Sequence, residues 1–361
     1  MVQMKKIRIA IAGASGYAGA ELVRLAALHP RFELCAVTSE KSSGIPVASV
    51  FPSLAGLVSL SFQALSPEAL AELAEAVFLA LPHTKSLDPA AACIRAGKLV
   101  VDLSADYRLK DPAVYQQWYQ TPHTHAGLLK DAVYGLPELH RTAIAKARLV
   151  ASPGCYPTAA VLQLAPLFAH DLIDQHGSIV IDAKSGISGA GRSPALPYHF
   201  PEAHESLEAY KVGQHRHTPE IEQELGELLG RAIRPSGLEA PQPLVTFTPH
   251  LVPMNRGILS TGYCRLKGPM ALSDLRNLYR AFYKGERFVR VQEDIMPNPR
   301  YIKGSNYCDI GVYLEPRAGS VITVAALDNL VKGAAGQAIQ AMNLMLGLPE
   351  ETGLTAPAAY P

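Results

Sequence analysis

The sequence has little of several features that mark specialised protein classes. It contains one tryptophan and five cysteines, and its formal net charge is only +1. A near-neutral chain without a Lys/Arg-rich run argues against electrostatic binding to nucleic acid. No stretch approaches the roughly 20 consecutive apolar residues of a transmembrane helix. These absences favour an ordinary globular protein without nucleic-acid or membrane partners.

The cysteines also exclude two kinds of site. An odd number of cysteines without regular spacing makes neither a disulfide framework nor a zinc site, so we expect no metal. The first residues, MVQMKKIRIAIAG, pass from two lysines directly into a strand pattern, and we expect no signal peptide. A reducing cytoplasm is the simplest setting for such a chain.

Length and composition predict two domains. The chain has 361 residues, of which 48% are hydrophobic and 18% are charged. That composition is ordinary for a globular protein, whereas the length exceeds what one hydrophobic core usually supports.

The first stretch resembles a nucleotide-binding unit. Residues 6–12 (KIRIAIA) form a strand pattern, GASGYAG follows, and AELVRLAALHP has helical spacing. Glycines in such a turn let the backbone approach a pyrophosphate, and the helix N-terminus directs N–H groups at it. The alternative is a tight turn that only packs against its helix. The residues of this turn that we expect to bind the cofactor are Gly13, Ser15, Gly16, Tyr17 and Gly19.

Strands then alternate with helices over the first half of the chain. Strand patterns lie at 32–39, 75–83, 98–106 and 147–152. This order predicts an α/β fold with a Rossmann-type, doubly wound parallel sheet. Ligands of such sheets bind at the carboxyl ends of the strands, so we expect Ser39, Pro82 and His83 to line the dinucleotide site.

The type of dinucleotide is less well defined. Glu40 lies roughly 20 positions beyond the glycines, where an acidic residue would bind the ribose 2′-hydroxyl of NAD. However, Thr38, Ser39 and Lys41 surround it, and hydroxyls with a lysine suit a 2′-phosphate. Both readings stay open, and we favour NADP(H).

The second half predicts a different domain. The stretch 178–192 begins as a strand and ends in a glycine/serine loop, strand patterns follow at 244–251 and 257–268, and 307–329 reads as a hairpin. These patterns favour an α+β domain with a largely antiparallel sheet. The stretch 330–347 predicts a small-residue-rich helix that packs back onto the first domain. We therefore expect residues 1–154 and 330–361 to form the dinucleotide-binding domain, and 155–329 to form the catalytic, substrate-binding and oligomerisation domain.

Cys155 stands apart from the other cysteines. It lies in SPGCYPT, between a buried strand pattern and an apolar helical stretch, and Pro157 suits a first helical turn. Unpaired N–H groups at a helix start stabilise a thiolate, which would lower the pKa of this thiol. The alternative is simple packing, which we expect for the cysteines in apolar or strand-like stretches: Cys35, Cys93, Cys264 and Cys308.

Two histidines flank an arginine at 215–217, just before a predicted helix at Thr218. The pair could hold a metal, but no third ligand is evident. They could equally lie in a solvated loop. A third reading makes His217 the general acid/base partner of the Cys155 thiol.

Eight motifs, in chain order, resemble the N-acetyl-gamma-glutamyl-phosphate reductase family of the semialdehyde dehydrogenase superfamily. They are GASGYAGAEL, LALPH, DLSADYR, SPGCYPTA, KSGISGAGR, HRHTPEIEQ, PMNRGI and LDNLVKGAAGQA, and the match spans residues 6–346. The resemblance implies NADPH-dependent reduction of N-acetyl-γ-glutamyl phosphate to N-acetylglutamate semialdehyde, with release of phosphate, in arginine biosynthesis. It also implies that Cys155 forms a thioacyl intermediate, that His217 is the acid/base, and that Ser185, Gly186 and Asn329 lie near the nicotinamide.

The implied substrate carries a carboxylate and a phosphate, which guanidinium groups bind bidentately. We therefore expect Arg108, Arg192 and Arg256 to bind it, and Tyr210 to orient it or the histidine.

Other readings remain at this stage. The same chemistry could act on an aminoadipyl or aspartyl phosphate, because one methylene discriminates by only about 1–3 kcal/mol. An inactive dinucleotide-binding sensor would need neither Cys155 nor His217. A homodimer or homotetramer is the expected assembly.

Overall fold

The chain divides into two compact units. The structure, a computed structural model, describes residues 5–174, 177–230 and 245–360. Unit 1 comprises Met1–Pro153 and Ala334–Ala356, and unit 2 comprises Gly154–Gly333 and Pro357–Pro361. The expected domain ranges also include residues 1–4, 175–176, 231–244 and 361, which lie outside the described residues.

Unit 1 is built on a parallel sheet of six strands in the order β2-β1-β3-β4-β6-β5, and every pair in it is parallel. The strands are β1 (Ile7–Ala12), β2 (Phe32–Val37), β3 (Ala76–Leu79), β4 (Leu99–Asp102), β5 (Val133–Tyr134) and β6 (Leu149–Ala151). The helices are α1 (Tyr17–Leu28), α2 (Val47–Val50), η1 (Pro52–Leu54), α3 (Pro67–Leu73), α4 (Leu87–Arg95), α5 (Pro112–Tyr119), α6 (Ala126–Asp131), α7 (Pro137–Ile144) and α12 (Gly336–Met345).

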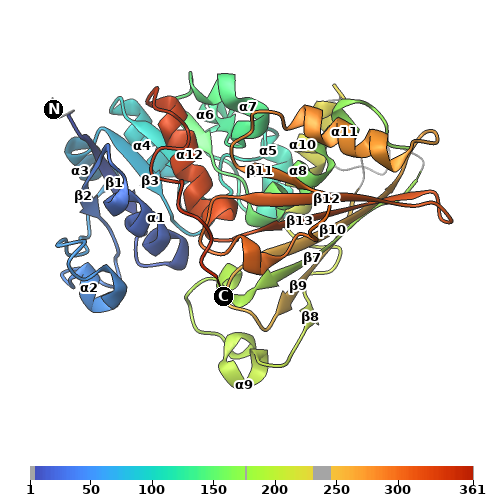
Figure 1. Ribbon diagram of the computed structural model, residues 1–361. Coiled ribbons are helices and arrows are strands. Elements are labelled where there is room, and N and C mark those ends of the chain that lie inside the picture. The colour runs from blue at the N-terminus through green and yellow to red at the C-terminus, as the bar shows by residue number, and fades with distance from the viewer. Residues whose placement is uncertain (1–4, 175–176, 231–244, 361) are drawn as a thin grey trace. The chain divides into compact units, whose positions relative to one another are not determined.

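Helices cover both faces of this sheet. Helix α12 contacts both α1 and α7 in one layer, and α3 and α4 form the other (Figure 1). The central strand β3, AVFL, is buried along its whole length. An apolar run without alternation is what a parallel strand requires when both of its faces are covered.

Residues 107–146 hold elements that the sequence pattern did not predict. Strand β5 has two residues and helix α6 has six, too few to produce a clear period. Helix α5 has a local start signal, because the Asp111 side chain accepts the N–H of Ala113.

Unit 2 contains a seven-stranded mixed sheet in the order β11-β12-β13-β10-β7-β9-β8. The strands are β7 (Ile179–Gly186), β8 (Glu208–Ala209), β9 (Val245–Val252), β10 (Ile258–Arg265), β11 (Val289–Gln292), β12 (Cys308–Glu315) and β13 (Ser320–Leu327). The pairs β11/β12 and β7/β9 are parallel and the other pairs are antiparallel. The predicted fold class is thus confirmed in both units.

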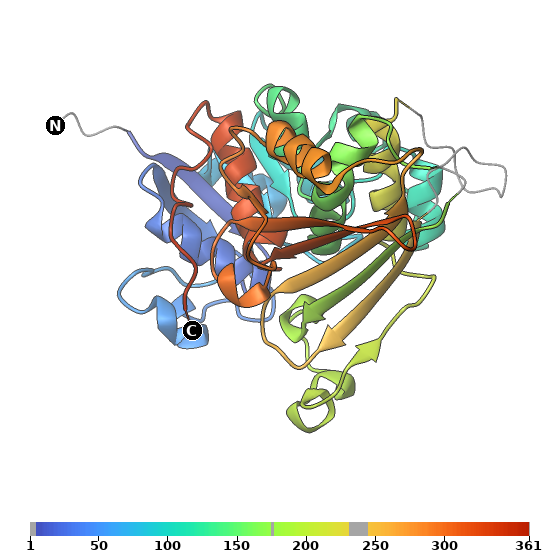
Figure 2. The ribbon, with the colours of Figure 1, turned by 45° about the vertical axis from the view of Figure 1, so that its right-hand side comes forward.

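The helical segments of unit 2 are α8 (Cys155–Ala169), η2 (Ile187–Ala190), η3 (Leu196–Tyr198), α9 (Phe200–Ala203), α10 (Thr218–Leu228), α11 (Leu272–Phe282) and η4 (Pro299–Tyr301). Helix α8 packs on β10, β12 and β13, with α10 and α11 beside it (Figure 2). Pro166 interrupts its hydrogen bonding, because proline donates none to the carbonyl of Leu162. The Tyr283 hydroxyl donates to that carbonyl instead.

The last predicted helix begins differently from the expectation. The pattern predicted one helix over 330–347, whereas the structure has a π-helical turn, η5 (Val331–Ala335), before α12 begins. The boundary between the two units falls within that turn.

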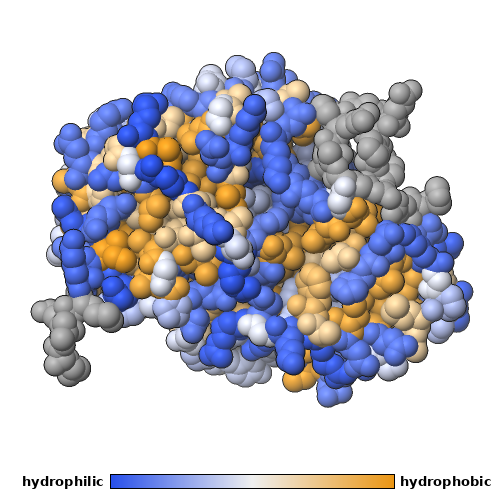
Figure 3. Space-filling model, turned by 90° about the horizontal axis from the view of Figure 1, so that it is seen from above, coloured by the Kyte–Doolittle hydropathy of each residue, from blue (hydrophilic) through white to orange (hydrophobic). Residues whose placement is uncertain are grey.

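Among the helices of the described residues, none is both long and apolar enough to cross a bilayer. On the face drawn in Figure 3, hydrophobic residues are visible between hydrophilic ones. That mixture is normal, because apolar atoms contribute more than half of most protein surfaces.

His29 joins the end of α1 to the C-terminal helix of unit 1. Its ring stacks on Phe32 with centroids 3.6 Å apart, and its Nε2 lies 3.1 Å from Oδ1 of Asn343. Nδ1 accepts the N–H of Arg31 at 3.2 Å, so the proton of the neutral ring lies on Nε2. Burial lowers the pKa of His29 to about 4.

This shift predicts a pH-dependent loss of stability. The folded state disfavours the charged ring, so His29 stabilises the fold fully above its unfolded pKa of about 6.5 and loses that contribution as pH falls toward 4. The loss reaches at most about 3 kcal/mol. Urea unfolding at several pH values between 7 and 4 should show a flatter profile for His29→Gln than for the wild type. Parallel profiles would show that His29 does not carry the effect.

Candidate active site

Cys155 is the first residue of helix α8. Gly154 is the N-cap with extended backbone angles, and its carbonyl accepts both the N–H and the hydroxyl of Thr158, each at 2.9 Å. The predicted helix start at Cys155 is therefore confirmed. The first N–H groups of a helix have no partner within it, and they carry the positive end of its dipole. Cys155 itself is half-buried, and its role as a nucleophile stays a prediction.

His217 lies against the residue that precedes this cysteine. A Cβ atom added to Gly154 would be only 2.5 Å from Nε2 of His217. A side chain at 154 would therefore displace the His217 imidazole, because real Cβ atoms do not approach other atoms so closely. His217 is the N-cap residue of α10, so the starts of α8 and α10 bring the predicted thiol and the predicted acid/base to one place.

Glu220 is a site residue that the sequence analysis missed. It is 1% exposed, and its Oε1 accepts the N–H of Gly154 at 2.8 Å. It follows His217 by three positions, and residues three apart share a helix face. That spacing, together with Pro219 in the first turn, was the available signal. The carboxylate fixes the peptide between Pro153 and Gly154, which immediately precedes Cys155.

Aromatic side chains surround the histidines. The ring of Tyr156 lies 5.7 Å from that of His215 and 6.0 Å from that of His217, edge to face. The hydroxyl of Tyr210 donates to that of Tyr156 at 3.3 Å, so Tyr210 lies in this cluster. That it orients the substrate or the histidine stays a prediction. Burial, Lys211 and Arg216 lower the pKa of His215 to about 3. Its Nδ1 accepts the N–H of His217 at 3.2 Å, so His215 orients the histidine loop.

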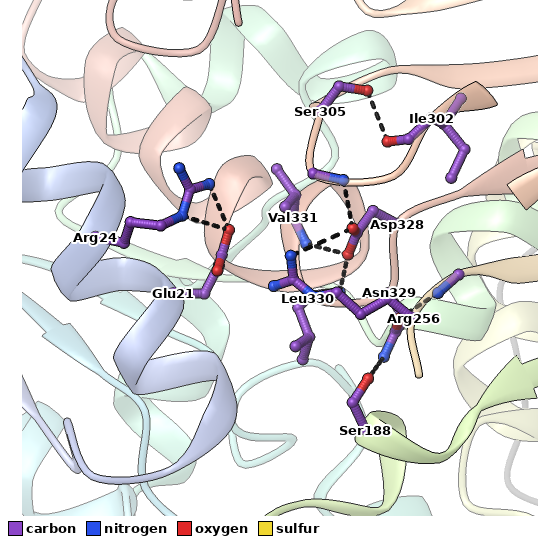
Figure 4. Close-up of polar contacts among 12 residues, drawn as sticks. Glu21, Arg24, Ser188, Arg256, Ile302, Ser305, Asp328, Asn329, Leu330 and Val331 are labelled. Carbon is purple, nitrogen blue, oxygen red and sulfur yellow. Dashed lines mark hydrogen bonds and ion pairs between the residues drawn. The ribbon is translucent and has the colours of Figure 1, made fainter. Parts of the chain in front are cut away.

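The residues predicted near the nicotinamide form a tight group in unit 2. Ser185 is 1% exposed and Asn329 is 2% exposed. Oδ1 of Asn329 accepts the N–H of Gly257 at 2.7 Å, and its Nδ2 donates to Ser188 at 3.0 Å (Figure 4). A Cβ on Gly186 would be 2.7 Å from the carbonyl of Asn255. Asn329 thus ties the end of β13 to the loops after β7 and before β10.

The predicted substrate arginines lie in three different environments. Arg256 places Nη1 3.5 Å from Oδ2 of Asp328 (Figure 4), and its side chain is 21% exposed. Arg192 is exposed after η2. Arg108, in unit 1, is 5% exposed, and donates from Nε to the carbonyl of Ser152 at 2.7 Å and from Nη2 to that of Leu103 at 2.8 Å. Arg108 therefore joins the carboxyl ends of β4 and β6, and substrate binding by all three stays a prediction.

The glycine-rich turn of unit 1 has two glycines that the fold itself requires. A Cβ on Gly13, whose φ is +76°, would lie 2.4 Å from the carbonyl oxygen of Ala80, and one on Gly19 would lie 2.4 Å from that of Gly13. At Gly16 the nearest such atom is 3.8 Å away, so the chain's own packing does not demand glycine there. Gly16 is the N-cap of α1, a position where a bound phosphate would come close to the backbone.

Residues that follow the neighbouring strands β2 and β3 lie at the same edge of the sheet as this turn. Ser15 and Ser39 share a hydroxyl–hydroxyl hydrogen bond of 2.8 Å, and Ser39 is 6% exposed. Tyr17, Pro82 and His83 are exposed at the same carboxyl edge of the sheet. Backbone amides, hydroxyls and a helix N-terminus are the groups that hold a dinucleotide, so the residues present fit the predicted cofactor.

A histidine and a buried carboxylate hold the loops at this edge of the sheet. Nδ1 of His83 accepts the N–H of Ala105 at 3.1 Å. Asp106 accepts the N–H groups of Thr84 at 2.7 Å and of Ser86 at 2.8 Å. Burial, followed by the charge of Asp106, raises the pKa of Asp102 to about 6.

Comparison with known proteins agrees with this site. The family described as semialdehyde dehydrogenase, NAD binding domain, matches residues 8–147, and the semialdehyde dehydrogenase dimerisation domain matches residues 155–329. Two relatives are named N-acetyl-gamma-glutamyl-phosphate reductase. That of Heliobacterium modesticaldum is 51% identical over 98% of this chain and 100% of its own, and that of Pelotomaculum thermopropionicum is 48% identical over 98% and 99%.

Solved structures agree on the fold. Aspartate semialdehyde dehydrogenase II from Vibrio cholerae has a TM-score of 0.70 at 16% identity, covering 95% of this chain and 99% of its own. Aspartate semialdehyde dehydrogenase with NADP from Candida albicans has a TM-score of 0.67 at 18% identity, with the same coverage. The resemblance seen in the motifs is confirmed, and the chain belongs to the N-acetyl-gamma-glutamyl-phosphate reductase family of semialdehyde dehydrogenases.

Proposed function

We propose that this protein reduces N-acetyl-γ-glutamyl phosphate to N-acetyl-L-glutamate 5-semialdehyde with NADPH and releases phosphate, a step of arginine biosynthesis. The observation that carries the proposal is the convergence of two helix starts, which brings His217 against Gly154 and hence beside Cys155. A thiol at a helix N-terminus beside an imidazole suits attack on an acyl phosphate.

The first half of the reaction forms a thioester. His217 takes the proton of the Cys155 thiol, and the thiolate forms a bond to the acyl carbon. The C–O bond to phosphate then breaks, and phosphate leaves with its electron pair and takes a proton from solvent. The N–H groups at the start of α8 stabilise the oxyanion of the tetrahedral intermediate.

The second half frees the aldehyde. When bound, the nicotinamide cofactor supplies a hydride to the thioester carbon. His217 gives its proton to the resulting oxyanion. It then moves that proton to the sulfur as the C–S bond breaks, so the thiol and the neutral imidazole are restored.

The remaining predicted residues bind the two ligands. In unit 1 we assign dinucleotide binding to the turn at Gly13 to Gly19 and to Ser39, Pro82 and His83. In unit 2 we assign binding of the nicotinamide to Ser185, Gly186 and Asn329. Arg108, Arg192 and Arg256 contribute charge for the carboxylate and phosphate of the substrate. This division assigns 1–154 and 330–361 to dinucleotide binding, and 155–329 to catalysis and oligomerisation.

We also propose a homodimer or homotetramer that works in the cytoplasm. The family match to a dimerisation domain supports the assembly. In the sheet of unit 2, Val180 and Thr261 are half-buried and Tyr263 is 42% exposed, on the side opposite the buried positions of the same strands. All five cysteines are free, which suits a reducing compartment.

Alkylation provides a direct test of the nucleophile. Burial raises the pKa of Cys93 to about 11 and that of Cys264 to about 12, and it also raises the pKa of Cys35. Iodoacetamide near neutral pH should therefore modify Cys155 first and abolish turnover. Cys155→Ser should keep NADPH binding and lose the reaction. Mass spectrometry of enzyme treated with the acyl phosphate alone should find the acyl group on Cys155, and an adduct on another cysteine would refute the mechanism.

The role of His217 can be tested at two positions. His217→Asn should lower kcat by roughly two to four orders of magnitude, the usual effect of removing a positioned acid/base. Gly154→Ala should have a comparable effect, because its Cβ would displace the imidazole. Gly127→Ala is a matched control, since a Cβ there meets nothing within 4 Å. Normal turnover by Gly154→Ala would argue against His217 acting at this position.

Cofactor preference tests the interpretation of the loop after β2. We expect kcat/KM to be higher with NADPH than with NADH, and Lys41→Gln to lower it roughly tenfold or more with NADPH, because a charge-assisted hydrogen bond contributes about 1.5–3 kcal/mol. NADH turnover by the same variant is the control. A higher kcat/KM with NADH in the wild type would indicate that Glu40 binds the ribose.

A further inference from the structure

Asp328 is a buried carboxylate that the reaction described above does not use. It follows β13 and is 0% exposed. Its Oδ1 accepts the N–H groups of Leu330 at 2.8 Å and of Val331 at 3.2 Å, and its Oδ2 accepts the N–H of Gly304 at 2.7 Å (Figure 4). Burying a charge is costly unless it is hydrogen-bonded, so a carboxylate with three backbone donors indicates a residue that fixes its surroundings.

The backbone of Asp328 also holds the residues that follow it. Its carbonyl oxygen accepts the N–H groups of Val331 at 3.2 Å and of Gly333 at 2.9 Å. These bonds begin the π-helical turn η5, in place of the α-helix that the sequence pattern predicted. Short π segments are often found at functional sites.

The turn ends against the nucleophile. A Cβ on Gly333 would lie 2.8 Å from Cβ and 3.2 Å from Cα of Cys155. The Gly333 backbone therefore forms one wall of the space around Cys155, and its distance from Cys155 depends on the bonds that Asp328 makes. No other side chain fits at 333 without moving one of the two segments.

The same segment is anchored on its other side. Arg256 approaches Oδ2 of Asp328 to 3.5 Å, which is longer than each of the three amide contacts. Asn329 bonds the N–H of Gly257 at 2.7 Å. The guanidinium thus offsets the charge of Asp328, while the amides determine where the turn lies.

We propose that Asp328 is a positioning residue for the thiol chemistry: it holds the turn 330–333 so that Gly333 confines Cys155 at the start of α8. This inference rests on the proposed function, because it assigns Cys155 as the nucleophile. A confined cysteine keeps its sulfur near the helix N–H groups and His217. A displaced turn frees the cysteine to adopt other orientations and lowers the rate of attack.

The first test compares two buried aspartates. Asp328→Asn keeps the shape of the side chain but places an NH2 group against one set of backbone N–H donors. We expect kcat, normalised to titrated Cys155 thiol, to fall at least about thirtyfold while the KM for NADPH changes less than about threefold. The rate of Cys155 alkylation near neutral pH should fall at least about fivefold, and its pH midpoint should rise.

Asp309→Asn is the matched control. Asp309 is 2% exposed and bonds the Arg290 guanidinium at 2.6 and 2.9 Å. This variant should lower the melting temperature but leave normalised kcat and alkylation unchanged. If Asp328→Asn behaves in the same way, Asp328 only stabilises the fold and the inference is wrong. A fall in kcat without a change in alkylation would also overturn it.

The second test acts on the wall itself. Gly333→Ala should reproduce the loss of normalised kcat and the slower alkylation, because its Cβ would meet Cys155. Gly268→Ala is the control, since a Cβ there has no neighbour within 4 Å. Wild-type behaviour of Gly333→Ala would overturn the inference. Failure of the wild type to form an acyl adduct on Cys155 would instead refute the proposed function, whatever the variants do.

Discussion

The packing of an imidazole against a glycine is the constraint on which the rest of this site depends. Gly154 has no Cβ, so His217 can place Nε2 within 2.5 Å of where that atom would be. The Gly154 N–H is bonded by Glu220, so one residue receives contacts from two side chains of the same helix start. The sequence around Cys155 is therefore constrained from outside its own helix, because a larger residue at 154 would displace the His217 imidazole.

Buried carboxylates with backbone N–H partners fix the conformation of loops in both units. Asp106 holds the loop after β3, Glu220 holds the peptide before Cys155, and Asp328 holds the turn that reaches Gly333. Each of these carboxylates loses water on burial and gains hydrogen bonds from backbone amides. Hydrogen bonds to an ionised acceptor are stronger than hydrogen bonds between neutral groups. Loops held in this way keep a defined conformation without disulfides, which a reducing compartment would not maintain.

Much of the fold and part of the candidate site could be predicted from the sequence, because the sequence patterns that mark them are local. The glycine turn, the alternation of strands and helices, and the helix start at Cys155 depend on neighbouring residues, and the structure confirms these elements. Glu220 could not be assigned, because its partner Gly154 lies 66 positions away in the chain. Asp328 and Gly333 could not be assigned either, because Gly304 lies 24 positions from Asp328 and Gly333 meets Cys155 from a remote part of the sequence. Strand β5 has only two residues, and the π-helical turn η5 begins with hydrogen bonds to the Asp328 carbonyl, so no periodicity marks either element.

The arginines show why residue type alone does not settle a role. A guanidinium has five N–H donors, and each donor that bonds the protein is withdrawn from a substrate. Arg108 donates from Nε and Nη2 to two backbone carbonyls, so its first role is structural: it joins the ends of two strands. Arg256 is partly exposed, and a longer contact pairs it with the charge of Asp328. An anionic substrate would compete with Asp328 for that guanidinium, whereas the backbone amides would keep Asp328 in place. If Arg256 binds substrate as we predict, it can do so while the three backbone amides keep Asp328 in place.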